Sequence, residues 1–317
     1  MIGDFAMELM KISFIIPCYN SEKSIEGVVK EIEDVCRDRY DYRIILSNDG
    51  SKDNVWQVIK KLCENNDRIT GICLSTNFGQ QSARMAAIPY AYGDYVVFMD
   101  DDGQHPVNEL PKLIDKVLEG YDIVYALFKS KKESIFRIIG SNINQITTRW
   151  LLGKPKDVKM SSFFVARRFV VDALKKYNSP GPVLNGYFLQ ITKNIANVEL
   201  PHRERNHGKS GYTLKKLLHL FMNNATSFSV QPLRLSSAIG GIMSAIGFIW
   251  AICVIIKKLL VPSVAVGYTS IIVVILICSG LMMLMLGLVG EYIGRMFIVA
   301  NNIPQYVIRE VKNGDIK

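Results

Sequence analysis

The sequence YVVFMDDDGQHP, residues 95–106, is the most informative part of this chain. Tyr95 to Met99 are apolar and predict a buried strand, and three aspartates follow directly. Adjacent carboxylates repel one another, and a strand end tolerates them best when a cation lies between them. Asp100 and Asp102 point the same way in an extended segment, so we expect them to share one divalent ion. The alternative is an acidic turn before a helix that begins near Pro106.

The same alternation of apolar strands and amphipathic helices covers the first 126 residues. It predicts an α/β fold with a mostly parallel sheet and helices on both faces. No G-x-G-x-x-G or Walker sequence follows a strand, which argues against a dinucleotide or P-loop site. The predicted strands are 12–17, 42–47, 69–74, 95–99 and 121–126, and the predicted helices are 25–35, 54–64, 80–92 and one from 106.

Polar residues follow the first two strands as well as the fourth. In open sheets of this kind, ligands bind beyond the carboxyl ends of the strands. An acid at the end of the second strand, Asp49, can accept hydrogen bonds from a base or ribose, although Asp-Gly-Ser is also ordinary turn chemistry. Hard oxygen ligands favour Mg²⁺ or Mn²⁺, which would neutralise a leaving diphosphate. The first strand ends in Pro17, Tyr19 and Asn20, and the second in Asn48, Asp49, Gly50 and Ser51.

Two long stretches near the C-terminus contain no charged residue: 235–256 and 268–290. Each can supply the roughly 20 apolar residues that span a bilayer, so we predict two transmembrane helices; the alternative is two buried helices of a soluble bundle. Met1 to Met10 does not resemble a secretory signal, so we expect the N-terminal domain in the cytoplasm. An even number of spans returns the C-terminus to that side. The basic residues after the second span agree with this orientation, whereas Lys257 and Lys258 disagree.

The net charge of +9 is concentrated between residues 129 and 176, where twelve Lys or Arg face three acids. This segment lacks a nucleic-acid recognition fold, so we expect anionic lipid and no nucleic acid as its partner. Residues 129–150 predict a basic amphipathic helix in the membrane interface, or a solvated helix packed on the domain. The predicted domains are a cytoplasmic domain at 1–232, a membrane hairpin at 233–290 and a C-terminal interfacial segment at 291–317.

The motifs together resemble family 2 glycosyltransferases of the GT-A fold. That resemblance is carried by Pro17-x-Tyr19-Asn20, by Asp49-Gly50-Ser51 and by Asp100-x-Asp102. Within the family, the chain is similar to polyprenyl-phosphate glycosyltransferases, a subgroup that includes dolichol-phosphate mannose synthase, bactoprenol glucosyltransferases and the formyl-aminoarabinose transferase. The segments that carry this second similarity are 77–79, 104–106, 202–212, 231–234 and 304–308.

The resemblance implies inverting transfer of a sugar from a nucleotide-sugar, with uridine preferred, to polyprenyl phosphate such as undecaprenyl phosphate. It also implies a multi-pass protein of the cytoplasmic membrane and a homo-oligomer, with a tetramer expected. Asp100 and Asp102 would be catalytic and, with Gln104, would hold Mg²⁺ or Mn²⁺. The implied donor-binding residues are Pro17, Tyr19, Asn20, Glu22, Asp49, Gly50, Ser51, Asn77 and Asp101, and the implied acceptor-phosphate residues are Arg203, Arg205, Ser210, Lys131 and Arg137.

The chain departs from the family pattern at two places. Asn48 stands where the second strand usually ends in paired acids, and Ser161 and Ser162 stand where many relatives carry an acid. The second departure is compatible with catalysis, because a phosphate monoester has its second pKa near 6 and needs no general base to become a nucleophile. Two other functions stay open: a processive polysaccharide synthase, and a catalytically inactive membrane scaffold.

Overall fold

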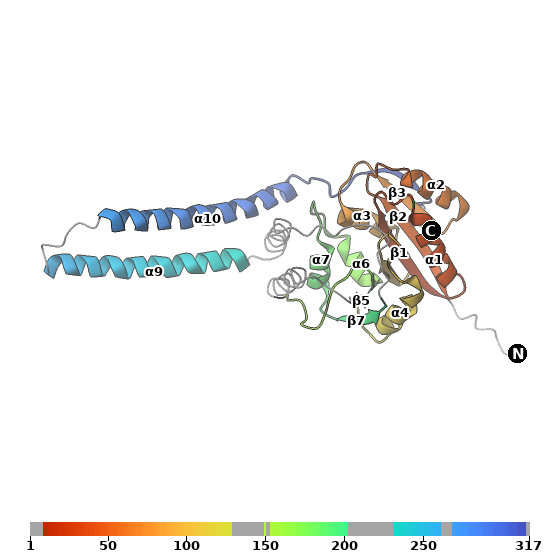
Figure 1. Cartoon of the computed structure of the whole chain (residues 1–317), viewed down its shortest axis with the longest axis horizontal. Helices are drawn as coiled ribbons and strands as arrows, with labels where there is room; N and C mark the ends of the chain where they lie inside the picture. The colour runs from red at the N-terminus through yellow and green to blue at the C-terminus, as the bar shows by residue number, and fades with distance from the viewer. Residues whose placement is uncertain (1–8, 129–148, 150–152, 202–230, 261–267, 315–317) are drawn as a thin grey trace. The chain divides into compact units, whose positions relative to one another are not determined.

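The structure, a computed structural model, describes residues 9–128, 149, 153–201, 231–260 and 268–314 (Figure 1). Contacts divide the chain into two units. The first comprises residues 1–213 together with 302–317, and the second comprises residues 214–301.

The first unit is built on a sheet with the strand order β7-β5-β6-β4-β1-β2-β3-β8 among the described residues. The pairs β1–β2, β1–β4 and β2–β3 are parallel, which confirms the predicted α/β arrangement with a mostly parallel sheet. Strand β6 runs antiparallel to both β4 and β5, whereas β5 and β7 are parallel. The strands are β1 (Met10–Cys18), β2 (Tyr40–Asn48), β3 (Ile69–Leu74), β4 (Tyr95–Phe98), β5 (Ile123–Phe128), β6 (Phe164–Arg167), β7 (Ile195–Leu200) and β8 (Ile308–Lys312).

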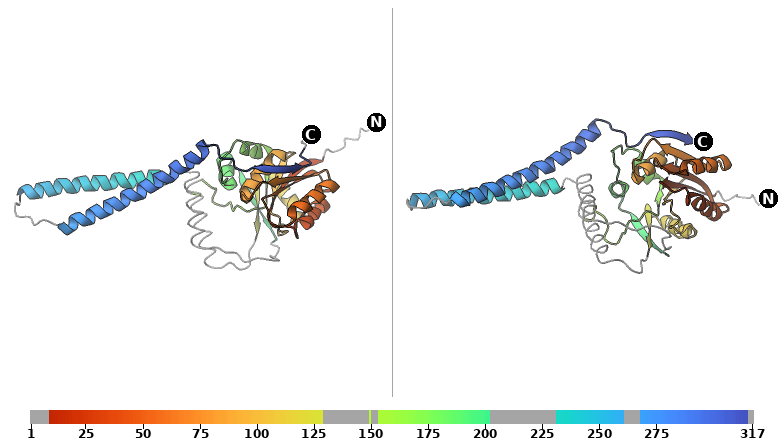
Figure 2. Two further views of the ribbon diagram at one scale, coloured as in Figure 1. Left: turned by 90° about the horizontal axis from the view of Figure 1, so that it is seen from above. Right: turned by 45° about the horizontal axis from the view of Figure 1, so that its top comes forward.

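Strand β8 corrects the prediction that residues 291–317 form an interfacial segment. Residues Ile308–Lys312 pair antiparallel with β3 and become an edge strand of the sheet (Figure 2). The mixture of apolar and charged residues, which we interpreted as interfacial, suits a half-exposed edge strand equally well. The pairing satisfies backbone groups of β3 that would otherwise form an open edge.

Helices cover both faces of the sheet, as predicted, because side chains alternate along each strand (Figure 1). Phe14 and Ile16 of β1 join one buried cluster with the apolar stripes of α1, α2 and α4. Helix α3 packs on β1, β2 and β3, and α6 contacts β4. The helices of the first unit are α1 (Ile25–Cys36), α2 (Val55–Asn65), α3 (Gln80–Ala87), α4 (Leu110–Leu118), α6 (Arg168–Leu174) and α7 (Leu184–Ile191).

Helix α3 is shorter than the predicted helix over residues 80–92. The α-helix ends at Ala87, and a 3₁₀ turn, Ile88–Tyr90, follows. Pro89 lacks a backbone N–H and its ring crowds the preceding turn, so it ends the α-helical hydrogen bonding. The segment then returns to the sheet at β4.

The second unit contains the helices α9 (Gln231–Leu260) and α10 (Tyr268–Ala300). Within the described residues, the stretch Cys278–Ala300 is long and apolar enough to cross a membrane, and Ser236–Trp250 is a shorter apolar helix. The two predicted spans therefore stay a prediction. A Cβ on Gly240 would lie 2.9 Å from Cε of Met285, so this glycine allows α9 to approach α10 closely.

Two glycines of the first unit give a matched test of the backbone geometry. Gly93 has φ +84°, and a Cβ there would lie 2.5 Å from the carbonyl oxygen of Lys11; Gly120 has φ +107° with nothing within 4 Å. Positive φ costs a non-glycine residue about 1–3 kcal/mol. We expect Gly120→Ala to show only that cost and Gly93→Ala to exceed about 3 kcal/mol because of the added clash. Thermal unfolding of both variants measures the difference, and equal destabilisation would contradict the packing of β1 against residue 93.

Candidate functional site

The site lies where the strand order of the sheet reverses. The chain runs from β1 to β2 and β3, and then returns to the other side of β1 as β4. Loops that leave β1 and β4 start from adjacent parallel strands at the same edge of the sheet, and open sheets bind ligands beyond this edge. The Tyr19 N–H donates to the Asp101 carboxylate at 3.0 Å, and Ser24 Oγ donates to the Asp101 carbonyl at 2.7 Å. Burial raises the pKa of Asp101, while hydrogen bonds to its carboxylate oppose the shift.

A second set of hydrogen bonds joins the loops after β1 and β2. The Asn20 N–H donates to Ser51 Oγ at 3.1 Å, and the Lys52 N–H donates to Asn20 Oδ1 at 3.0 Å. The Asn54 N–H donates to Glu22 Oε2 at 3.1 Å. The structure thus brings these predicted donor-binding residues together, with Asn20 and Glu22 acting as links between the two loops. Pro17 is buried within β1, opposite Ser47 of β2.

Asp49 is buried beneath the loop of residues 75–79. Its side chain accepts the Phe78 N–H at 2.7 Å, and the residue is 2% exposed. Burial raises the pKa of Asp49, and the N–H groups of Phe78 and Gly79 oppose that shift. Gly50 has φ +61°, and a Cβ there would lie 2.4 Å from the carbonyl carbon of Thr76. The loop therefore packs directly on the Asp49-Gly50 turn, and it leaves Asn77 exposed.

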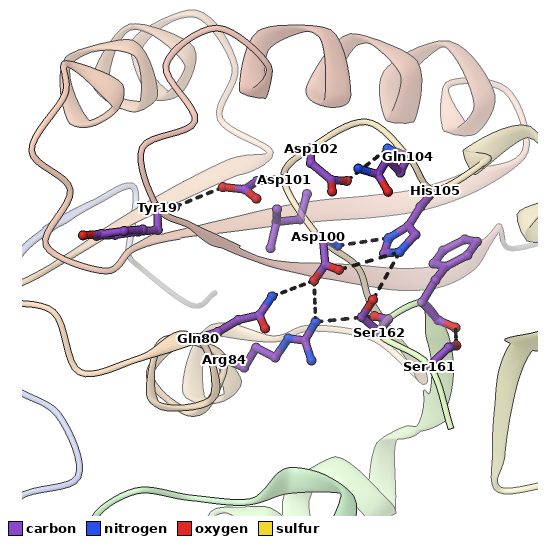
Figure 3. Close-up of polar contacts among 12 residues, drawn as sticks. Tyr19, Gln80, Arg84, Asp100, Asp101, Asp102, Gln104, His105, Ser161 and Ser162 are labelled. Atoms are coloured by element: carbon purple, nitrogen blue, oxygen red, sulfur yellow. Dashed lines mark hydrogen bonds and ion pairs between the residues drawn. The ribbon is translucent and has the colours of Figure 1, made fainter. Parts of the chain in front are cut away.

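Asp100 faces helix α3. Its Oδ1 accepts Gln80 Nε2 at 2.7 Å and Arg84 Nη2 at 2.8 Å (Figure 3). The Asp100 N–H donates to Nδ1 of His105 at 3.1 Å. Burial lowers the pKa of Arg84, and the adjacent Asp100 charge opposes this. Asp100 is thus the partner of a buried cation.

The chain bends after Asp100, and Asp102 lies within this bend. Its Oδ1 accepts the Gln104 N–H at 3.1 Å, and Figure 3 shows its side chain beside Gln104 rather than beside Asp100. The expectation that Asp100 and Asp102 point the same way is wrong, because residues 101–103 bend and Gly103 has φ +72°. Among the residues that the structure describes, no group of three His, Cys, Asp or Glu side chains is placed to hold a metal ion. The exposed Asp102 carboxylate still offers the hard oxygen donors that Mg²⁺ and Mn²⁺ prefer.

His105 connects Asp100 to Ser162. Its ring stacks on Phe163 at 5.1 Å and on Phe128 at 5.9 Å between centroids. Burial lowers the pKa of His105, which favours the neutral ring. Because Nδ1 accepts the Asp100 N–H, the neutral ring carries its proton on Nε2, which lies 3.3 Å from Ser162 Oγ. Ser162 Oγ is therefore placed as an acceptor for His105.

Sequence reasoning did not identify Gln80 and Arg84 as parts of this site. One signal was available, since Arg84 stands among Ala83, Ala86 and Ala87 on a helix that packs on the sheet. A charged residue in such a row needs a buried partner. The predicted acceptor-phosphate residues lie outside the described residues: Lys131, Arg137, Arg203, Arg205 and Ser210.

The Arg84–Asp100 pair predicts coupled effects on stability. The side chains are 5% and 21% exposed, and removing one member of a buried pair costs about 3–5 kcal/mol because the other charge stays unpaired. We expect Arg84→Met to lower the free energy of unfolding by that amount, and the double variant with Asp100→Asn to lose less than the sum of the single changes. Arg167→Met should cost less than about 1 kcal/mol, because the Arg167 side chain is 44% exposed and lies 4.0 Å from Asp122. Thermal unfolding of the four variants measures the coupling; strict additivity would contradict it.

Comparison with known proteins gives matches over most of the chain. Residues 13–174 match the family described as Glycosyl transferase family 2, and residues 231–296 match the GtrB C-terminal hairpin. The uncharacterized glycosyltransferase YkcC of Bacillus subtilis is 33% identical over 306 residues, which cover 95% of this chain and 94% of that protein. The undecaprenyl-phosphate 4-deoxy-4-formamido-L-arabinose transferase of Aeromonas hydrophila is 30% identical over 315 residues, which cover 96% of this chain and 94% of that protein.

Solved structures share the fold at lower identity. Glucosyl-3-phosphoglycerate synthase from Mycobacterium tuberculosis, in complex with phosphoglyceric acid, superimposes with a TM-score of 0.51 and 20% identity over 69% of this chain and 79% of that chain. The same enzyme with Mn²⁺, UDP-glucose and phosphoglyceric acid gives a TM-score of 0.51 at 20% identity over 69% and 78% of the two chains. At this identity the likeness describes the fold alone.

Proposed function

The chain belongs to glycosyltransferase family 2, and we propose that it transfers a sugar from a nucleotide-sugar to a polyprenyl phosphate, with undecaprenyl phosphate as the acceptor. One observation carries the proposal: the loops after β1, β2 and β4 are joined by hydrogen bonds at the reversal point of the sheet. That location supports a nucleotide site. The acceptor class is supported by relatives, matched over nearly their whole length, that are named as undecaprenyl-phosphate transferases.

The donor half of the proposed site is the region around Asp49 and Tyr19. The Tyr19 side chain is 46% exposed beside the carboxyl end of β1, so its ring is available to a nucleobase. The Asp101 carboxylate accepts a hydrogen bond from the Tyr19 N–H, and the Ser51 hydroxyl accepts one from the Asn20 N–H. These contacts would orient the loops before the donor binds. A uridine donor is the preferred hypothesis, and a structural neighbour crystallised with UDP-glucose supports it.

The metal half of the proposed site is Asp102 with Gln104, and Asp100 stands nearby. When bound, Mg²⁺ or Mn²⁺ would offset the negative charge that develops on the leaving diphosphate. Asp102 would provide carboxylate oxygens, and the side-chain oxygen of Gln104 would add a neutral ligand. A structural neighbour of the same fold is described in complex with Mn²⁺ and UDP-glucose, which supports a divalent ion in the proposal. Oδ1 of Asp100 is hydrogen-bonded to Gln80 and Arg84, so the carboxylate would join these ligands through its other oxygen, Oδ2.

The acceptor supplies its own nucleophile in this proposal. A phosphate monoester is largely dianionic at neutral pH, so an attacking oxygen needs no proton removed. The contact between His105 Nε2 and Ser162 Oγ supports this, since it makes the serine an acceptor and not a base. A single in-line attack on the anomeric carbon inverts its configuration. Arg203, Arg205, Ser210, Lys131 and Arg137 stay the proposed phosphate ligands.

The membrane part of the proposal uses the helices α9 and α10. Their match to the GtrB C-terminal hairpin supports two membrane spans. The proposal further places the catalytic unit in the cytoplasm and the chain in a homo-oligomer, with a tetramer expected. A catalytically inactive membrane scaffold is the second candidate. It is favoured by the ion pair between Arg84 and Asp100, which engages one of the three predicted metal ligands.

Sugar transfer to lipid and its dependence on a divalent ion test the proposed function together. We expect the purified full chain to move label from a nucleotide-sugar into solvent-extractable undecaprenyl lipid in the presence of Mn²⁺ or Mg²⁺, and excess EDTA to stop it. Asp102→Asn should abolish turnover because an amide binds the ion more weakly. Asp115→Asn, an exposed change on α4, is the matched control and should keep full activity. Full activity of Asp102→Asn, or activity in EDTA, would reject the metal site.

The acceptor half is tested by two variants and a pH series. Ser162→Ala should reduce turnover only modestly, because no proton has to be removed there. Arg205→Ala removes a charge-assisted contact of roughly 1.5–3 kcal/mol, so affinity for undecaprenyl phosphate should fall about 10- to 100-fold. Activity of both should fall below about pH 6, where the acceptor phosphate gains a proton. Initial rates from pH 5 to 9 measure this; an inactive Ser162→Ala beside an unaffected Arg205→Ala would show that the acceptor binds elsewhere.

A further inference from the structure

The segment after the helix α10 is fastened to the first unit at both ends. We call residues 305–313 the C-terminal strap. At its start, Gln305 is buried, and its Nε2 donates to the Ser179 carbonyl at 3.0 Å. At its end, Nδ2 of Asn313 donates to the Cys63 carbonyl at 2.7 Å and to the Ile69 carbonyl at 3.0 Å. The strap is therefore held by specific amide contacts in addition to its pairing with β3.

The middle of the strap contains a bulge that redirects one side chain. Glu310 lies opposite Cys73 and Ile308 lies opposite Leu74, so Arg309 is an extra residue in the ladder. Bulges of this kind re-aim a side chain and are common beside active sites. Here Nη2 of Arg309 donates to the Ser75 carbonyl at 3.0 Å. The Ser75 N–H donates to the Val307 carbonyl at 2.8 Å, so the strap binds both backbone groups of Ser75.

Ser75 is the first residue of the loop that covers Asp49. Three residues further, the Phe78 N–H donates to Asp49 Oδ1 at 2.7 Å. Between them, the Thr76 backbone lies against Gly50 so closely that a Cβ there would be 2.4 Å away. A displacement of Ser75 would therefore pass to Asp49 and Gly50, because close-packed backbone cannot absorb it.

The neighbouring strap residue contacts the other segment that flanks Asp49. Nε1 of Trp56 donates to Oε2 of Glu310 at 3.1 Å. Trp56 lies in the first turn of α2, which follows the turn Asp49-Gly50-Ser51. Arg309 and Glu310 thus hold the chain on both sides of the proposed nucleotide turn, one through the loop before α3 and the other through α2.

We propose that Arg309 is a positioning residue for the nucleotide, and that the C-terminal strap, which follows the membrane hairpin in sequence, sets the affinity of the donor site through Ser75 and Asp49. This inference rests on the proposed function, because it concerns the nucleotide half of the same site. If the strap only covered the edge of β3, substitutions in it would lower stability and would have no specific effect on the affinity for the donor.

The test uses the full chain in detergent and measures binding of UDP, and separately of GDP, with Mn²⁺ by titration calorimetry. Loss of one hydrogen bond that orients the loop should raise the Kd of UDP about 3- to 10-fold in Arg309→Ala. Arg309→Lys keeps a donor and should stay within about 2-fold of the native protein. Lys30→Ala removes an exposed cation from α1, outside the strap and its contacts, and is the matched control; its Kd should not change.

Measurements of KM and of the melting temperature distinguish a role in positioning the nucleotide site from a role in stability alone. We expect Arg309→Ala to raise KM for the nucleotide-sugar while KM for undecaprenyl phosphate and the melting temperature match those of Lys30→Ala. Trp56→Phe removes the N–H donated to Glu310 together with part of the ring, and it should also raise the Kd of UDP, which keeps the test open if Arg309→Ala fails to fold. Equal nucleotide affinity in Arg309→Ala and Lys30→Ala, or in Trp56→Phe and the native chain if Arg309→Ala does not fold, overturns the inference. A native chain that binds neither UDP nor GDP overturns the proposed function and the inference with it.

Discussion

The hydrogen bond from the Tyr19 N–H to the Asp101 carboxylate joins the two strands between which the sheet order reverses. The link holds the loop after β1 against the loop after β4, and the elements that follow these loops, α1 and the 3₁₀ turn Val107–Glu109, contact each other. Asp49 makes the corresponding contact for β2 through the Phe78 N–H. The carboxylates of Asp49 and Asp101 are largely buried, and each fixes a loop of the site by accepting a backbone N–H. The side chains of Tyr19, Asn77 and Asp102 on these loops are exposed.

The three consecutive aspartates each contact a different part of the site. Asp100 faces the buried Arg84, Asp101 holds the loop after β1, and Asp102 lies beside Gln104. Charge repulsion among them is thus relieved by a guanidinium and by backbone N–H groups as well as by any bound cation. This division explains why the Asp-x-Asp spacing alone was a poor guide to side-chain direction.

Features that follow from local periodicity were predictable. Strand β3 has the predicted bounds, and the acids of β2 and β4 lie at the same edge of the sheet because parallel strands end together. Features that depend on pairing between distant segments were not. Strand β8 pairs with β3 across more than two hundred residues, and Arg84 meets Asp100 only after α3 packs on the sheet. Neither contact leaves a periodic signal in the sequence.

The central claim is that this site passes a sugar from a nucleotide to a polyprenyl phosphate. The most direct measurement is mass spectrometry of undecaprenyl phosphate after incubation with the purified chain, Mn²⁺ and a panel of nucleotide-sugars offered one at a time. The account predicts that one donor increases the lipid mass by a single monosaccharide residue, with release of its nucleoside diphosphate. An unchanged lipid with every donor, or a ladder of several sugars on one lipid, would contradict it.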